Sequence, residues 1–329
     1  MDETVLATGA TGGPAAGLLV PLAAGGALAA GAAETSPALP LGATWPFGVF
    51  FGLVGLCVGS FLNVCIHRLP AGKGLVWPGS HCPVCLAPIA WYDNLPVVSY
   101  FVLRGRCRRC GSRFSVRYML VEAATGLVFL GYWLAYFRLG VREGADHLAV
   151  YAVHMVLASA LLASGVIDYE RKEIYTSVTN TALAVGLAAS LLWPQVQRVG
   201  ATDGRLPDWT GWARTDALLL ALVGAAVGAG IIYGTRAVGT LVFRKEAMGL
   251  GDVYLMAAVG GCLGWEAAVL VFFTAPFLGL IYGVWHLARR RGSEVPYGPF
   301  LGMAAGLVML VQEEVVAYFR PGIEALVFG

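Results

Sequence analysis

Long apolar runs separated by short charged segments dominate this chain. Six runs have the length of a helix that crosses a bilayer, and a seventh, from Asp252 to Ala288, is long enough for two short crossings that turn at Gly264-Trp265-Glu266. The pattern predicts an all-α polytopic membrane protein with about eight transmembrane helices. The six single spans are expected at residues 46–66, 119–138, 148–168, 177–194, 216–238 and 299–318.

The composition agrees with this pattern, because 58% of the residues are hydrophobic and only 13% are charged. The mean hydropathy of +0.71 lies outside the range of soluble globular domains. Many of the 44 glycines fall inside the apolar runs, where small residues let helices approach one another closely in a membrane. We expect the lipid bilayer as a partner. We find no nucleotide-binding or nucleic-acid-binding motif, and expect no nucleic-acid partner.

Lysine and arginine predict how the helices are oriented. Most of these 22 residues follow the first, third, fifth and seventh spans, so the positive-inside rule makes those loops cytoplasmic and puts both termini outside the inner (plasma) membrane. Arg244-Lys245 and Arg289–Arg291 then share one side only if the chain crosses twice between them. The expected segments are an extension at 1–45, a first helix at 46–66, a cytoplasmic loop domain at 67–118, a seven-helix domain at 119–318 and a tail at 319–329.

The extension is rich in Gly and Ala and contains no Lys or Arg. A secretory signal peptide begins with basic residues, so we predict none here. The composition favours a flexible segment, because glycine weakens helices and alanine adds little to membrane insertion. A weak apolar span at residues 15–33 is the alternative.

Two Cys-x-x-Cys pairs in the cytoplasmic loop predict a metal site. Two such pairs present four thiolates, which suit tetrahedral zinc, and four thiolates fill the shell and leave no position for a catalytic water. Arg104, Arg106, Arg108 and Arg109 would help to keep the thiols deprotonated. Disulfides are the alternative, although a reducing cytoplasm disfavours them. The expected ligands of this structural zinc are Cys82, Cys85, Cys107 and Cys110.

Two aspartates lie at the cytoplasmic ends of predicted spans. Asp168 closes one apolar run, and Asp252 opens another directly after Gly249-Leu250-Gly251. Ionisable residues in membrane spans are costly and point to function. Two converging carboxylates can share one proton, so that one activates water and the other polarises a scissile carbonyl. Gly249 and Gly251 would allow a sharp turn and a close substrate strand. The alternative is that Asp168 only caps the membrane interface and that Asp252 only N-caps its helix.

Several segments in the same order resemble the bacterial type IV prepilin peptidases, a family of GxGD-type aspartic membrane proteases. The resemblance covers about residues 47–310 and does not include the N-terminal extension. The segments that carry it are Gly59–Val64, His67–Pro70, the two cysteine pairs, Asp93–Tyr100, Arg117–Glu122, Glu246–Asp252 and Val295–Leu301.

The resemblance implies an inner-membrane enzyme whose catalytic residues are Asp168 and Asp252. Its substrates would be prepilins and pseudopilins of type IV pili or type II secretion, cleaved just after a glycine on the cytoplasmic side. In bifunctional members the new N-terminus is then methylated with S-adenosylmethionine, which the four-cysteine loop makes plausible here.

The chain departs from the family pattern at two places. Ile174-Tyr175-Thr176 stands where the family has Pro-Asp, and Tyr254 stands where it has lysine. These changes alter the charges around the aspartates, so the pH optimum and substrate preference are not expected to follow the family. Two alternatives remain: a proton- or ion-coupled transporter, and an inactive membrane anchor that presents a zinc knuckle.

Overall fold

The computed structural model describes residues 41–141, 147–198, 206–244, 248–288 and 296–328. The predicted span at 15–33 and nearly all of the predicted extension lie outside these residues. The described parts are helical, apart from loops and two isolated antiparallel bridges. The long helices are α1 (Leu41–Arg68), α3 (Val116–Trp133), α4 (Leu148–Arg171), α5 (Thr176–Leu192), α7 (Ala213–Phe243), α8 (Leu250–Leu263), α9 (Trp265–Ala288) and α10 (Gly298–Phe328).

Short helical elements complete the described chain. Two of them, η1 (Trp91–Asn94) and α2 (Val98–Val102), belong to the loop between α1 and α3. The π-helical segment η2 (Leu134–Arg138) continues α3, and α6 (Gln195–Arg198) follows α5. The long helices are therefore joined mostly by short connections, with one large loop after α1.

All eight predicted helices are present, and the chain is a multi-pass membrane protein. Six helices in the described residues are long and apolar enough to cross a bilayer, whereas α5 has 17 residues and α8 has 14. The predicted turn between α8 and α9 is confirmed at Gly264, whose φ of 92° suits glycine. The last helix continues to Phe328, so most of the predicted tail at 319–329 is helical.

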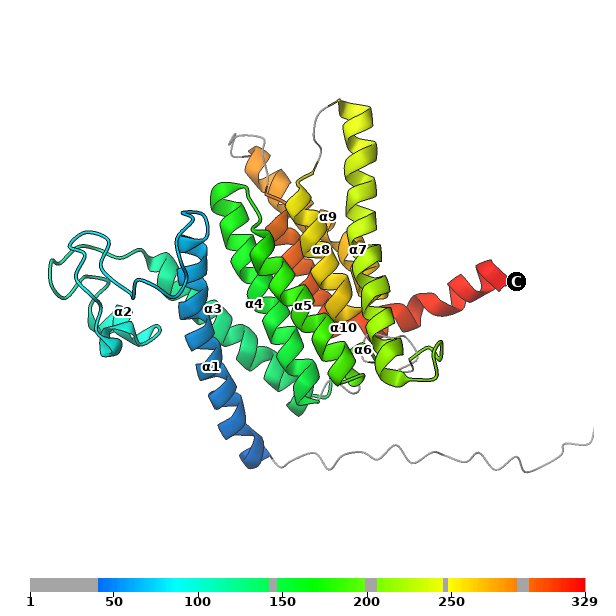
Figure 1. Ribbon diagram of the computed structural model, residues 1–329, viewed down its shortest axis with the longest axis horizontal. Coiled ribbons are helices and arrows are strands. Elements are labelled where there is room, and N and C mark those ends of the chain that lie inside the picture. Colours follow the sequence, from blue (N-terminus) through cyan, green and yellow to red (C-terminus); the bar gives the residue numbers. More distant parts are fainter. Residues whose placement is uncertain (1–40, 142–146, 199–205, 245–247, 289–295, 329) are drawn as a thin grey trace, which may run out of the picture. The chain divides into compact units, whose positions relative to one another are not determined.

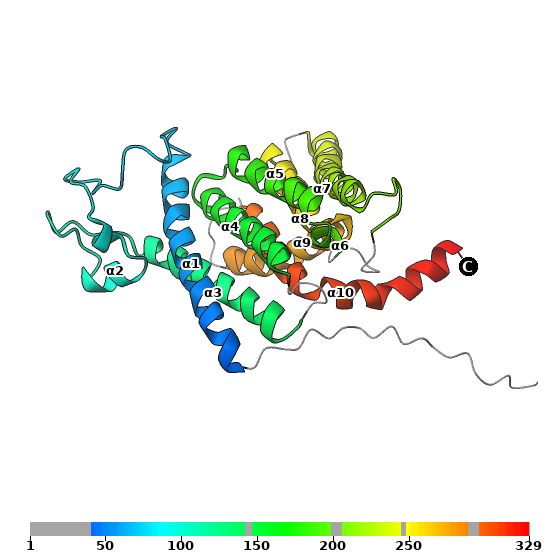
Figure 2. The ribbon, with the colours of Figure 1, turned by 60° about the horizontal axis from the view of Figure 1, so that its bottom comes forward.

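Helix α8 occupies the centre of the bundle. In Figure 1, α4, α5, α8 and α7 lie side by side, and Figure 2 shows α9 and α10 completing the ring around α8. Most of α8 is buried, and a helix that is apolar on every side is suited to such a position. A Cβ on Gly224 of α7 or on Gly260 of α8 would overlap the facing backbone carbonyl, so these two helices pack in backbone contact.

Helices α1 and α3 form a second tightly packed pair. A Cβ at Gly55 of α1 would lie 2.7 Å from Phe129, and one at Gly126 of α3 would lie 2.5 Å from Leu56. The rings of Phe51 and Trp133 stack with centroids 4.6 Å apart, and the edge contacts of both rings with Tyr151 attach the pair to α4. These contacts hold together the two helices that flank the large loop.

Candidate active site and metal centre

Asp168 lies in the last turn of α4 and is 8% exposed. Its Oδ2 accepts a hydrogen bond of 2.8 Å from the backbone N–H of Gly298, the first residue of α10. A Cβ on Gly298 would lie only 2.7 Å from that oxygen, so the contact requires glycine. The N-terminus of a long helix also carries a partial positive charge that favours a carboxylate. Asp168 is therefore held in place by a neighbouring helix.

Asp252 lies in the first turn of α8 and is 7% exposed. The N-cap residue of this helix is Gly249, with no side-chain cap bond, so Asp252 is not the N-cap that the alternative interpretation required. Neither Gly249 nor Gly251 has a positive φ. A Cβ on Gly251 would lie 2.5 Å from that of Ile174, so this glycine allows the start of α8 to pack against the α4–α5 connection.

One segment brings the two aspartates together. The Gly298 N–H contacts Asp168, and burial together with the nearby charge of Asp252 raises the pKa of the Tyr297 phenol to about 12. The two carboxylates are also close enough to interact electrostatically with each other. The resemblance to the family included the segment Val295–Leu301 but gave it no role. Within this segment, Gly298 bonds to Asp168, and Tyr297 is close enough to Asp252 to feel its charge.

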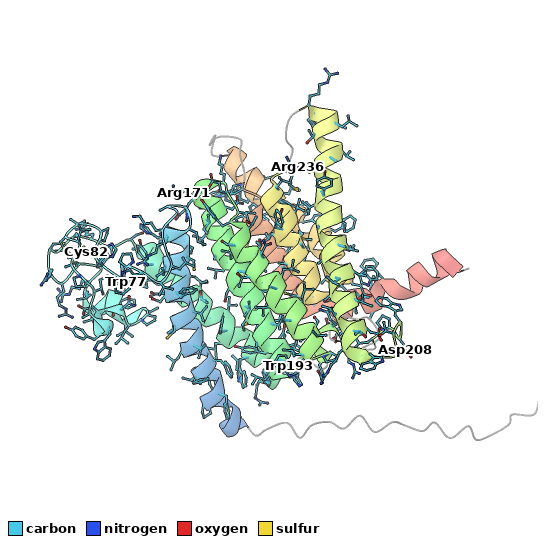
Figure 3. The ribbon with its side chains drawn as sticks, in the orientation of Figure 1. Trp77, Cys82, Arg171, Trp193, Asp208 and Arg236 are labelled. Atoms are coloured by element: carbon cyan, nitrogen blue, oxygen red, sulfur yellow. The ribbon has the colours of Figure 1, made fainter. Side chains whose placement is uncertain are left out.

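The departures from the family pattern lie beside this site. Tyr254 is 43% exposed, and the Tyr175 hydroxyl donates to Glu173 at 3.0 Å. The Ile174 side chain packs on Gly251. Figure 3 shows Arg171 at the end of the bundle where Asp168 lies, and Trp193 and Asp208 at the opposite end.

The four cysteines predicted as metal ligands form one cluster. All four sulfurs lie within 4.8 Å of one another. The Sγ atoms of Cys82 and Cys110 are 3.8 Å apart, and those of Cys85 and Cys107 are 4.0 Å apart. A tetrahedron with Zn–S bonds of about 2.3 Å has edges of about 3.8 Å, whereas a disulfide bond is only about 2.05 Å long. The four cysteines are free and fit a tetrahedral metal, so the disulfide alternative is wrong for this structure.

The two cysteine pairs have the same backbone design. The N–H of Cys82 donates to Ala87 and that of Leu86 to Cys82, and Cys107, Ser112 and Gly111 repeat both bonds in the second pair. The fifth residue of each turn has a positive φ, 55° at Leu86 and 69° at Gly111. In the first turn, the backbone N–H groups of Val84 and Cys85 point at the sulfur of Cys82. This arrangement suits thiolates that share a cation.

Hydrogen bonds prepare Cys82 for metal binding. Backbone N–H groups of Cys85 and Val84 and the hydroxyl of Ser112 lower the pKa of the Cys82 thiol to about 6. Arg108 is one of the arginines expected to keep the thiols deprotonated. Its guanidinium instead forms an ion pair with Asp93, at 2.6 Å. That ion pair ties the second cysteine turn to η1. The sequence pointed to the arginines as the groups that lower the thiol pKa. At Cys82, backbone N–H groups and the Ser112 hydroxyl have this effect.

Comparisons with known proteins agree with this architecture. The sequence model "Bacterial Peptidase A24 N-terminal domain" matches residues 53–136, and "Type IV leader peptidase family" matches residues 155–284. The first match contains the four-cysteine loop, and the second contains both aspartates. No solved structure matches the chain significantly.

Named relatives cover most of the chain. A "Prepilin leader peptidase/N-methyltransferase" of Myxococcus xanthus is 39% identical over 72% of this chain and 62% of its own length. A "Type 4 prepilin-like proteins leader peptide-processing enzyme" of Escherichia coli is 34% identical over 78% of this chain and 91% of its own length. A further leader peptidase/N-methyltransferase, from Klebsiella pneumoniae, is 37% identical, with 68% and 90% covered. The chain therefore belongs to the type IV leader peptidase family.

Proposed function

We propose that this protein is a membrane aspartic endopeptidase that removes the leader peptide of type IV prepilins and pseudopilins. The observation that carries the proposal is the approach of two buried aspartates, from α4 and α8, to one segment at the start of α10. The family match and the names of the relatives point to the same reaction.

In this proposal Asp168 and Asp252 are the catalytic pair. An ionised carboxylate takes a proton from water while a protonated one polarises the scissile carbonyl, so no covalent intermediate forms. The Gly298 N–H fixes the position of the Asp168 carboxylate. Gly249 is the N-cap of α8 and Gly251 lies in its first turn, so the two glycines form the start of the helix that carries Asp252.

The position of the site in the membrane follows from the charges. Arg171 is the last residue of α4 and Lys172 follows it, at the end that carries Asp168, so the positive-inside rule assigns this end to the cytoplasm. We infer that the protein lies in the inner membrane with both termini outside and meets its precursors at the cytoplasmic face.

The metal that fits the four cysteines is a structural zinc. Four thiolates complete the shell, so the ion would hold the loop together and activate no water. Because several relatives are named peptidase/N-methyltransferases, we further propose that the protein methylates the new N-terminus using S-adenosylmethionine. The sequence contains no nucleotide-binding motif that locates this donor.

The two alternative functions receive no specific support. Among the described residues, the buried carboxylates Asp168, Asp216 and Asp252 lie in first or last turns of helices rather than along a path through the membrane. A proton or ion pathway would place ionisable groups at several depths. An inactive anchor would have no need for two buried aspartates.

The test is processing of a pilin-type precursor in cells that lack their own peptidase. The wild-type chain should remove the leader, and Asp168→Ala and Asp252→Ala should not. Glu173→Gln, which changes an exposed acid just after α4, is the matched control and should process normally. Normal processing by either alanine variant would refute the assignment of the pair.

A further inference from the structure

A second polar cluster lies where α1 and α3 touch. Ser60 and Asn63 of α1 face the carboxylate of Glu122 on α3. The two helices approach closely here, because a Cβ on Gly59 would lie 2.7 Å from the Cα of Glu122. The Oε2 of Glu122 accepts a hydrogen bond of 2.8 Å from the backbone N–H of Val97.

This cluster has more hydrogen-bond acceptors than donors. Asn63 is 5% exposed, and its Nδ2 donates to the carbonyl of Tyr118 at 2.8 Å. Its Oδ1 is buried and accepts no hydrogen bond from any residue that the structure describes. Glu122 has two carboxylate oxygens and Ser60 a hydroxyl. A buried acceptor without a donor is unfavourable, so the group is suited to a ligand that brings several N–H donors.

Strained backbone covers the same cluster. Val97 has φ 62° and ψ −49°, and the N–H of Val98 donates to the carbonyl of Pro96 at 2.6 Å, which together define a γ-turn with a positive φ. A β-branched residue rarely adopts this conformation. The Glu122 carboxylate holds this turn by accepting the N–H of Val97. Strain of this kind is concentrated at ligand clamps and switch regions.

A small apolar core lies between this polar cluster and Asp168. Ile66 and Val121 pack in the same small core as Ile167, the residue before Asp168. An ion pair between Arg117 and Glu170 also joins the start of α3 to the end of α4. The acceptor cluster therefore belongs to the end of the helices where the peptide bond would be cut.

We propose that Ser60, Asn63 and Glu122 bind the new N-terminal ammonium group of the processed substrate and present it for methylation. This inference rests on the proposed function, because leader cleavage is the step that creates the amine. An ammonium group brings three donors and a positive charge, which match one carboxylate and two neutral acceptors.

Glu122 then has a defined chemical task. The ammonium nitrogen cannot attack until it loses a proton, and the Glu122 carboxylate accepts that proton. The nitrogen lone pair forms the new N–C bond to the methyl group of S-adenosylmethionine, a sulfonium donor. The C–S bond breaks, and its electron pair stays on sulfur, leaving a neutral thioether. Charge and protons balance without any oxidant.

The first test separates methylation from cleavage. The full-length protein is co-expressed with a pilin-type precursor, and the mass of the mature product reports both steps. Glu122→Gln should lower the methylated share of the cleaved product at least about tenfold, and Ser60→Ala should lower it less. Thr125→Val is the matched control, because Thr125 lies one turn further along α3 and bonds only within its helix, to Val121 at 2.7 Å. Its product should be cleaved and methylated as in the wild type.

The outcomes distinguish this inference from the proposed function. If the wild type cleaves and methylates while Glu122→Gln leaves the methylated share unchanged, the inference is wrong and the peptidase stands. Equal loss of cleavage and methylation in Glu122→Gln would also overturn it, because the residue would then serve the fold or the peptidase. If the wild type does not cleave, the proposed function fails, and binding alone must decide the inference.

The second test measures that binding. The full-length protein in lipid nanodiscs is titrated with a peptide of the mature N-terminus, with its amine free or acetylated. The free amine should bind at least about tenfold more tightly to the wild type, and Glu122→Gln should remove most of this difference. An acetylated leader peptide that contains lysine tests whether a side-chain ammonium is the ligand instead. The proposal would be overturned if the acetylated leader peptide bound as tightly as the free-amine mature peptide. It would also be overturned if acetylation of the mature peptide did not weaken its binding.

Discussion

Replacing Gly298 with alanine should slow leader cleavage, because the added Cβ clashes with one carboxylate oxygen of the proposed catalytic pair. The new Cβ would lie 2.7 Å from Oδ2 of Asp168, well inside the normal contact distance of the two atoms. Since the oxygen belongs to the carboxylate that the Gly298 N–H holds at 2.8 Å, relief of the clash must lengthen or break that hydrogen bond. A hydrogen bond to a charged group contributes about 1.5–3 kcal/mol, which corresponds to a rate loss of roughly 10- to 100-fold.

The chain provides a control on the same helix. A Cβ on Gly302, one turn further along α10, would be 3.5 Å from the nearest atom, which is an ordinary contact. Both variants are assayed for the rate of leader removal from a purified precursor, and their thermal unfolding is compared. Gly298→Ala should cleave at least about tenfold more slowly than Gly302→Ala at similar thermal stability. Full activity of Gly298→Ala would refute the role given to this contact.

Further predictions concern the metal centre and the topology. The purified protein should contain one zinc per chain, and Cys107→Ser should lower the zinc content and expose the loop to proteases. Leu86→Gly should raise zinc affinity, because glycine adopts the positive φ at this position with about 1 kcal/mol less strain, and Gly111→Ala should lower the affinity by a similar amount. Competition with a chelator measures both affinities. The opposite changes in affinity would contradict the shared design of the two turns. Reporter fusions at the two termini should both be active outside the cytoplasm.

The apolar pattern predicted the helices but not their individual lengths. Six spans are visible because lipid-facing helices must be about 20 residues long and apolar. Helix α8 is shorter because other helices surround it, so protein rather than lipid sets its length. Its turn into α9 was predictable from glycine at position 264, whereas the extension of α10 to Phe328 gave no clear signal.

The site shows which contacts a sequence can and cannot reveal. Charge and position along the chain were enough to predict that Asp168 and Asp252 lie at the same end of the bundle. The bond from Gly298 to Asp168 joins residues 130 positions apart, so no local pattern could predict it. The pairing of Arg108 with Asp93 was hidden for the same kind of reason, since several arginines were equally placed in the sequence. Only the packing of helices and loops selects the partner.

The most direct test of the central claim is leader cleavage by Asp168→Asn and Asp252→Asn in lipid nanodiscs. Each change keeps the shape of the side chain but removes its ability to ionise. Both variants should lose at least about 1,000-fold in cleavage rate while remaining folded, because each removes one member of an acid–base pair. Glu173→Gln should retain the wild-type rate. If either asparagine variant cleaves at more than about a tenth of that rate, Asp168 and Asp252 are not the catalytic pair.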